Sequence, residues 1–206
     1  MSYNVGMKQK APVRLRDRNR LRTRQELLDT ALDLFEAGGL AACSVDAVAK
    51  QAGTSKTTAY TYFPGGIDEM LRDQYRIIAE RVRVRGEQAR SAATTVEDRI
   101  TALIAALLDI CAEPKIGRFY MMLTPALSPL LEPVVGETSA HFRRLIASDL
   151  ERKLPSGVPP TASATLIVGA AREAAIAVAR DPSQREVLLT ALRMTVRAML
   201  SVKAGR

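Results

Sequence analysis

The side chains best suited to recognition chemistry lie in residues 44–63, where hydroxyls, tyrosines and one lysine recur at helical spacing. Lys56 offers a positive charge, and Thr57 and Thr61, four residues apart, fall on one side of a helix. A threonine hydroxyl can donate to or accept from a base edge, and its methyl group can contact thymine. This combination is typical of a helix that reads the floor of a DNA groove.

Other polar side chains of the same segment suit the sugar-phosphate backbone. Thr58, Tyr60 and Tyr62 can contact phosphate oxygens or flanking bases. Ser44 can contact a phosphate together with the backbone N–H groups of a helix N-terminus. For each of them an ordinary surface position is the alternative. The candidate DNA-binding residues here are Ser44, Lys56, Thr57, Thr58, Tyr60, Thr61 and Tyr62.

Two short helices joined by a tight turn must position these side chains. Ser44 and Ser55 are good N-caps for the first and the second helix. Gly53, between them, can adopt the left-handed backbone conformation that a sharp turn needs. Ala59 and Phe63, four apart, point back to a core. The segment is therefore predicted to be a helix-turn-helix.

Most of the positive charge lies at the N-terminus. Residues 1–24 carry eight lysines and arginines against Asp17 alone, and so hold +7 of the formal net charge of +8. Such an arm suits a polyanion, either nucleic acid or an anionic membrane surface, and a solvated tail is the ordinary alternative. Beside a helix-turn-helix, DNA is favoured. The candidate DNA-binding arginines of the arm are Arg14, Arg16, Arg18 and Arg20.

Apolar periodicity divides the chain into an arm and two helical domains. Residues 1–20 lack this periodicity and are predicted to be a flexible basic arm. Residues 21–66 form the helix-turn-helix domain, in which Thr23 to Glu26 fits a capping box and Gly38-Gly39 ends the first helix. Residues 67–206 form a larger helical domain.

The pattern of this larger domain contains no alternating β segment of useful length, so the predicted fold class is all-α. The prolines at 114, 125, 129 and 133 predict shorter or bent helices there. Ser183 to Glu186 is expected to cap the last helix. The longer helices are predicted near 68–89, 95–110, 136–154, 161–180 and 184–202.

Catalysis is not indicated by this sequence. It has a single histidine, His141, and lacks the metal-binding, nucleophile-elbow and glycine-loop motifs of common catalytic sites. We therefore expect no enzymatic activity, no metal and no cofactor. Cys43 and Cys111 lie far apart in apolar helical patterns, which favours buried free thiols in a cytoplasmic protein.

Membrane insertion is not expected either. The N-terminus is polar and basic, without an apolar signal segment. The most apolar run, residues 165–178, is interrupted by Arg172 and Glu173, which makes it too short and too charged to span a bilayer. We expect no membrane partner.

Residues 22–71 resemble the DNA-binding domain of TetR-family transcriptional regulators. Where that family commonly has a lysine at the start of its fourth helix, this chain reads Gly65-Gly66-Ile67. The resemblance implies a C-terminal domain that binds a small molecule and dimerises through its last two long helices, with ligand binding releasing DNA. The matching residues are Thr23-Arg24, Leu34-Phe35, Gly39, Ser44-Val45, Val48-Ala49, Ala52-Gly53, Ser55-Lys56, Tyr60, Tyr62, Phe63 and Pro64.

The last two predicted helices, about 161–180 and 184–202, carry more apolar surface than a thin monomer needs. The first is rich in alanine and glycine, which let helices approach closely, and the second has apolar residues on more than one face. A four-helix homodimer interface is favoured over a simple core, mainly by the resemblance. Two-fold symmetry would give a palindromic operator with half-sites about one helical turn apart, or slightly more.

An effector pocket is expected between the helices of the larger domain. Residues 119–122 form a soft aromatic and methionine stretch that could adapt to varied shapes. Core packing is the ordinary alternative for every candidate. The expected effector is a small, largely apolar and fairly bulky molecule. The candidate ligand-binding residues are Leu107, Cys111, Phe119, Tyr120, Met122, His141, Phe142 and Arg172.

The sequence thus predicts a helix-turn-helix regulator with a helical ligand-binding and dimerisation domain. We expect a sequence-specific DNA-binding protein of the nucleoid, a ligand-released repressor that binds a palindromic operator as a dimer. The alternative is a non-enzymatic adaptor whose basic arm binds an anionic membrane surface or nucleic acid.

Overall fold

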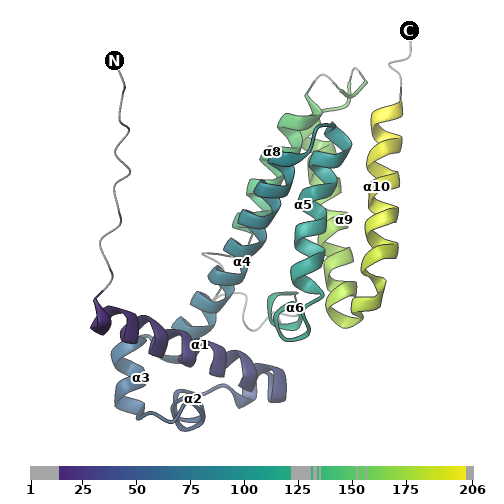
Figure 1. Cartoon of the computed structure of the whole chain (residues 1–206). Coiled ribbons are helices and arrows are strands. Elements are labelled where there is room, and N and C mark those ends of the chain that lie inside the picture. Colours follow the sequence, from purple (N-terminus) through teal and green to yellow (C-terminus); the bar gives the residue numbers. More distant parts are fainter. Residues whose placement is uncertain are drawn as a thin grey trace, which may run out of the picture.

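The computed structural model describes residues 14–121, 131, 134, 136–151, 153–155 and 157–202 of the 206-residue chain. These residues form helices, turns and loops without a β-strand, which confirms the all-α prediction. A small bundle of α1 to α3 lies at one end, and α4 leads from it into a longer bundle (Figure 1). The helices are α1 (Leu15–Ala42), α2 (Val45–Gln51), α3 (Lys56–Tyr62), α4 (Gly66–Ala92), α5 (Val96–Cys111), α6 (Pro114–Met121), α8 (Glu137–Leu150), α9 (Pro160–Arg180), the 3₁₀ turn η2 (Pro182–Gln184) and α10 (Arg185–Ser201).

Helix α1 begins at Leu15, eight residues before the start predicted at Thr23. The capping-box signal is overridden because arginine and leucine are good helix formers, and extending an existing helix costs little. Glu26 forms an ion pair with Arg22 at 3.4 Å. Residues 14–20, predicted to be a flexible arm, are therefore helical from Leu15 onward. The remainder of the predicted arm lies outside the described residues.

The glycine pair predicted to end the first helix does break its regular geometry. Gly38 and Gly39 have non-helical dihedral angles, and Gly39 has a φ of 65°. At the other predicted turn, Gly53 has a φ of 66°, the left-handed conformation expected between the two short helices. Residues other than glycine rarely adopt this backbone conformation, which explains the glycines at positions 39 and 53.

A small apolar core holds the helix-turn-helix together. The predicted inward residues Ala59 and Phe63 are fully buried in it. Met70 from the first turns of α4 completes the cluster, so α4 is part of both bundles. The core residues are Leu27, Leu28, Ala31, Val45, Val48, Ala49, Ala59, Phe63 and Met70.

The larger core forms around α5, which packs against α4, α6, α8, α9 and α10. Thr95 caps α5 as predicted, because its hydroxyl accepts a bond from the Asp98 amide at 3.0 Å. Helix α4 contributes Leu71, Ile78 and Val82, one turn or two apart, to this core. The predicted cap of the last helix is wrong: the Asp181 carboxylate accepts from the Ser183 amide and caps η2 instead.

Helix α9 is longer than the apolar run considered in the sequence. Among the described helices it alone has the length and composition to cross a membrane, with 21 residues and an 18-residue stretch of mean hydropathy 1.4. It nevertheless packs against α5, α6, α8 and α10. Its buried side, which includes Ile167, Ala171 and Val178, belongs to the larger core. Burial in the helical bundle accounts for the apolar residues on this side of the helix.

The two bundles are joined by specific contacts as well as by α4 itself. The rings of Phe35 in α1 and Phe119 in α6 meet edge to face with their centroids 5.2 Å apart. Close by, Arg118 of α6 donates to Glu36 of α1 at 3.1 Å. These contacts link α6 of the larger bundle directly to α1 of the helix-turn-helix domain.

Candidate nucleic-acid interface

Helix α3 presents an exposed polar face built from the predicted residues. Lys56, Thr57, Tyr60 and Thr61 are exposed, and Tyr60 keeps 42% of its surface accessible. The Thr61 hydroxyl donates to the Thr57 carbonyl oxygen at 3.0 Å. Within the described part of the chain, the Thr57 hydroxyl makes no hydrogen bond, so it is available to a base edge.

The start of α3 is fixed by the cap that the sequence predicted. The Ser55 hydroxyl accepts from the Thr58 amide at 3.0 Å, and the two hydroxyls share a hydrogen bond of 2.8 Å. Thr58 is half-buried and locally bonded. Its geometry favours a cap role over a direct base contact. Ser44 similarly accepts from the Ala47 amide at 3.1 Å and remains exposed at the start of α2.

Lys56 is held by a partner that sequence reasoning missed. Its ammonium donates to the Asp46 carboxylate at 2.9 Å, and both side chains are exposed. The hydrogen bond from Lys56 to Asp46 raises the pKa of the lysine. The pair joins the first turns of α2 and α3. Acidic Asp46, ten residues away across the turn, gave no sequence signal of this contact.

The two tyrosines have different surroundings. Tyr62 is half-buried against the small core, so its ring helps to orient α3. Tyr60 lies beside the start of α4, where a Cβ on Gly66 would come within 3.5 Å of its ring. At this point the Gly65 amide donates to the Glu69 carboxylate at 2.8 Å. The start of α4 thus offers a carboxylate rather than the family's lysine.

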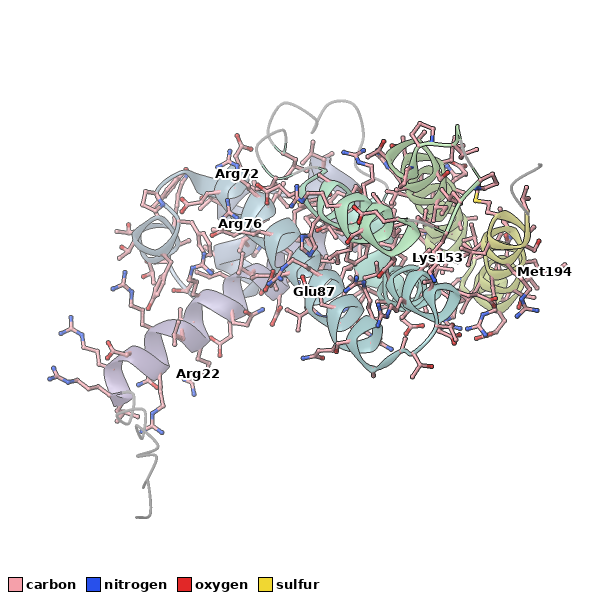
Figure 2. The ribbon with its side chains drawn as sticks, turned by 90° about the horizontal axis from the view of Figure 1, so that it is seen from above. Arg22, Arg72, Arg76, Glu87, Lys153 and Met194 are labelled. Carbon is pink, nitrogen blue, oxygen red and sulfur yellow. The ribbon has the colours of Figure 1, made fainter. Side chains whose placement is uncertain are left out.

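Arg16, Arg18 and Arg20 lie on the exposed first turns of α1, and Arg14 is its N-cap residue. Figure 2 shows Arg22 near the free end of this helix. Residues two apart point to nearly opposite sides of a helix, whereas residues four apart share a side. One row therefore contains Arg14, Arg18 and Arg22, and the opposite row contains Arg16 and Arg20. A duplex lying on one side meets only one row.

Arg24, which continues the second row, serves the fold instead. Its guanidinium pairs with the Asp73 carboxylate of α4. It also lies 4.8 Å from the ring centroid of Phe63, the C-cap residue of α3. Such a cation–π contact is worth about 0.5–2 kcal/mol. Arg24 therefore ties α1, α3 and α4 together beneath the recognition face.

Most of the predicted ligand-binding residues are part of the larger core. Cys111, Phe119, Tyr120 and Phe142 are buried and Leu107 is partly buried in it, whereas Arg172 is exposed. Met122 lies outside the described residues. Burial raises the pKa of the Cys111 thiol to about 12, so this cysteine is unreactive near neutral pH. Both cysteines are free, as predicted, and Cys43 is half-buried.

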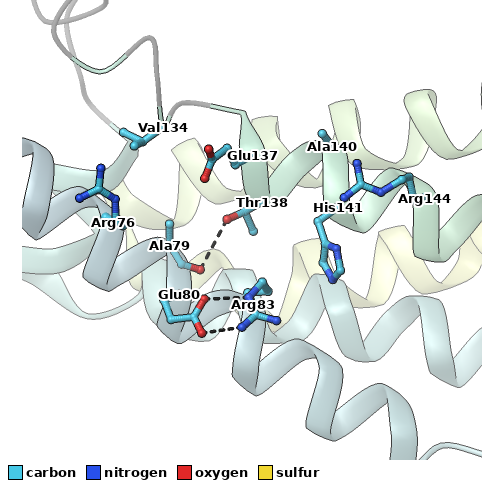
Figure 3. Close-up of a pocket in the computed structure, with 10 residues that line it drawn as sticks. All are labelled: Arg76, Ala79, Glu80, Arg83, Val134, Glu137, Thr138, Ala140, His141 and Arg144. Carbon is cyan, nitrogen blue, oxygen red and sulfur yellow. Dashed lines mark hydrogen bonds and ion pairs between the residues drawn. The ribbon is translucent and has the colours of Figure 1, made fainter.

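One of the predicted ligand residues, His141, lines a cleft. This cleft has a volume of about 450 Å³ and lies between α4 and α8 (Figure 3). Its wall is more polar than predicted, because three arginines line it together with two glutamates. No cluster of three or more His, Cys, Asp or Glu side chains that could hold a metal occurs among the described residues.

The recognition helix α3 is exposed, Ser44 and Ser55 cap α2 and α3, and a separate helical bundle follows. This arrangement defines a helix-turn-helix DNA-binding regulator. The family model described as "Bacterial regulatory proteins, tetR family" matches residues 27–73. No curated protein matches the chain significantly in sequence. Residues 27–73 thus match the DNA-binding domain of the TetR family, as the sequence resemblance predicted, and the match is to a family of transcription factors.

Solved structures share the fold over most of the chain. A transcriptional regulator from Rhodococcus sp. Rha1 is 22% identical, with a TM-score of 0.70 over 86% of this chain and 95% of its own. A TetR-family regulator from Pectobacterium atrosepticum is 22% identical, with a TM-score of 0.67 over 92% and 99%. A fatty acid degradation regulator from Bacillus halodurans is 16% identical, with a TM-score of 0.70 over 92% and 96%.

Proposed function

We propose that this chain is a dimeric, ligand-released repressor that binds a palindromic operator through α3 and the arginines of α1, in the cytoplasm at the nucleoid. The observation that carries the proposal is the exposed face of α3, where Lys56, Thr57, Tyr60 and Thr61 stand on a helix fixed by the Ser55 cap. A repressor bound to an operator that overlaps a promoter would block RNA polymerase sterically.

Selection of bound duplexes from a random DNA pool tests this proposal. Sequencing should recover an inverted repeat with half-sites about one helical turn apart, or slightly more. A pool without an enriched motif, bound only at low salt, would contradict it. That outcome would favour the adaptor alternative, in which the basic arm alone carries the binding.

A single base contact can be tested at Thr57. Replacing Thr57 by alanine should weaken binding to the selected operator by about 1–3 kcal/mol, because the helix loses one donor and a methyl contact. Binding to unrelated DNA should stay unchanged, as phosphate contacts carry it. Fluorescence anisotropy with both duplexes measures the two affinities. An equal loss on both would rule out a base-reading role.

The exposed apolar side of α9 and α10 supports the dimer. Leu166, Val187 and Met194 expose 66%, 72% and 64% of their surface. Met194 lies at the outer edge of the molecule (Figure 2). Val187 and Met194, two turns apart, share one side of α10. On α9, Gly169 lies one turn from Leu166 and has open space where a Cβ would be, which allows close approach. A second copy of the chain would bury this apolar patch.

Replacing Met194 by aspartate should therefore dissociate the dimer at micromolar concentration, because the interface would bury an unpaired charge. Replacing Val158 by aspartate is the matched control, since this exposed valine lies in the loop before α9. Sedimentation equilibrium distinguishes the species. A wild-type chain that is already monomeric, or a variant that stays dimeric, would contradict the assigned interface.

A further inference from the structure

The cleft between α4 and α8 is lined by apolar, hydroxyl and charged side chains. Ala79, Val134 and Ala140 supply its apolar lining, and the two alanines leave room for a ligand. A volume of about 450 Å³ lies within the range of small-molecule sites. Arg76 lies toward one end, and His141 and Arg144 lie toward the other (Figure 3). The cleft thus fits an elongated molecule with an apolar body.

One end of the cleft is fixed by a charged network. Arg83 donates to Glu80 at 2.5 Å and to Glu87 at 2.7 Å. The Nε2–H of His141 donates to the same Glu87 oxygen at 2.6 Å. The hydrogen bond from Arg83 lowers the pKa of Glu80, which stays ionised. Because Arg83 and His141 are satisfied by glutamates, neither is the main attraction for a ligand.

Arg144 is different, because its guanidinium has no ion-pair partner among the described residues. It projects from α8 beside the network of Arg83 and His141. The other unpaired charge of the cleft, Glu137, lies two helical turns away on α8, about 10 Å along the axis. An anionic group is therefore favoured at the Arg144 end and disfavoured at the Glu137 end.

Arg76 connects the cleft with the recognition helix. Its guanidinium donates to one oxygen of the Asp73 carboxylate at 2.8 Å. The other Asp73 oxygen pairs with Arg24, which lies over the Phe63 ring at the end of α3. A ligand whose apolar body displaces Arg76 leaves both Asp73 oxygens to Arg24. The Arg24 guanidinium would then move toward α4, and its contact with the Phe63 ring would change.

We propose that this cleft binds a small organic carboxylate through Arg144, and that Arg76, Asp73 and Arg24 transmit its occupancy to the recognition helix. The transmission to the recognition helix rests on the proposed DNA-binding function, whereas the binding of the carboxylate in the cleft does not. It assigns an acidic head to the apolar effector that the sequence predicts. The carboxylate of the ligand lies over Arg144, and the apolar body of the ligand lies over Ala79 and Ala140 toward Arg76.

Calorimetry on the full chain without DNA tests the cleft. The probes are octanoate and benzoate, each compared with its uncharged amide. Both acids should bind better than their amides, and Arg144→Gln should weaken the acids about tenfold or more by removing a charge-assisted contact. Arg143→Gln, an exposed neighbour outside the cleft, is the control. Absence of acid binding up to about 10 mM, or equal losses in both variants, overturns the cleft proposal.

Operator affinity with and without the better-binding acid tests the transmission. The acid should weaken operator binding by the wild-type chain, and Arg76→Gln should retain acid binding but lose this response. An unchanged operator affinity in the wild type, or a full response in Arg76→Gln, overturns the transmission. A chain that selects no operator yet binds the acids through Arg144 refutes the proposed function and leaves the cleft standing.

Discussion

Replacing Asp149 by alanine should lower the free energy of unfolding by about 3 kcal/mol, the largest loss we expect from a single polar side chain. The Asp149 carboxylate is 3% exposed and accepts two bonds from Arg90, at 2.7 and 2.8 Å. Arg99 lies 3.6 Å away. The cluster joins α4, α5 and α8, and its loss leaves the half-buried Arg90 without a counter-charge.

Thermal unfolding measures this effect. For a chain of this size, 3 kcal/mol corresponds to a fall in Tm of roughly 6–12 °C. Glu113→Ala is the matched control, because the Arg81–Glu113 pair has exposed side chains, 43% and 40%, and an exposed pair contributes at most about 1 kcal/mol. Similar Tm values for the two variants would show that the buried cluster does not stabilise the fold.

Replacing Arg14, Arg16, Arg18 and Arg20 together by glutamine should flatten the salt dependence of operator binding. Each phosphate contact adds about 0.9 to the slope of log affinity against log salt, so the loss for each protomer is about 1.8 if one row meets the duplex and about 3.6 if all four arginines do. The four side chains are exposed, so the fold should be unaffected. Anisotropy titrations at several salt concentrations measure the slope. An unchanged slope would make the arm a solubilising tail.

Two further variants separate a helical arm from an extended one. On helix α1 the rows of Arg14, Arg18 and Arg22 and of Arg16 and Arg20 face opposite sides, so replacing one row should change the slope far more than replacing the other. In an extended arm, residues two apart point the same way. Slopes that fall in proportion to the number of arginines removed would therefore show that the arm unfolds on DNA.

The helix-turn-helix was the part of the fold most fully determined by sequence. Its stop and start signals are local: Ser44 and Ser55 bond to amides three residues ahead, and Gly53 adopts the positive φ that the turn requires. Helical periodicity likewise placed Ala59 and Phe63 in the core. Such features depend on neighbours within one or two turns, which a single sequence contains.

The helical start of α1 at Leu15 shows the limit of local signals. Thr23 carries a good cap pattern, but a cap competes with helix extension, and the outcome depends on small differences in free energy. The sequence also placed several interior residues in a ligand pocket. Cys111, Phe119 and Phe142 instead pack in the core. Apolar type alone does not distinguish a residue that lines a cavity from one that fills it.

By itself, then, the sequence determined the class of fold, the helix-turn-helix and the concentration of charge at the N-terminus. Only the tertiary structure decided the long-range pairings: Lys56 with Asp46, Arg24 with Asp73 and Phe63, and Arg90 with Asp149. It also brought Arg76 and Arg144 to one cleft. The reason is physical: caps and periodicity act within a helix, whereas ion pairs and clefts depend on how separate helices pack.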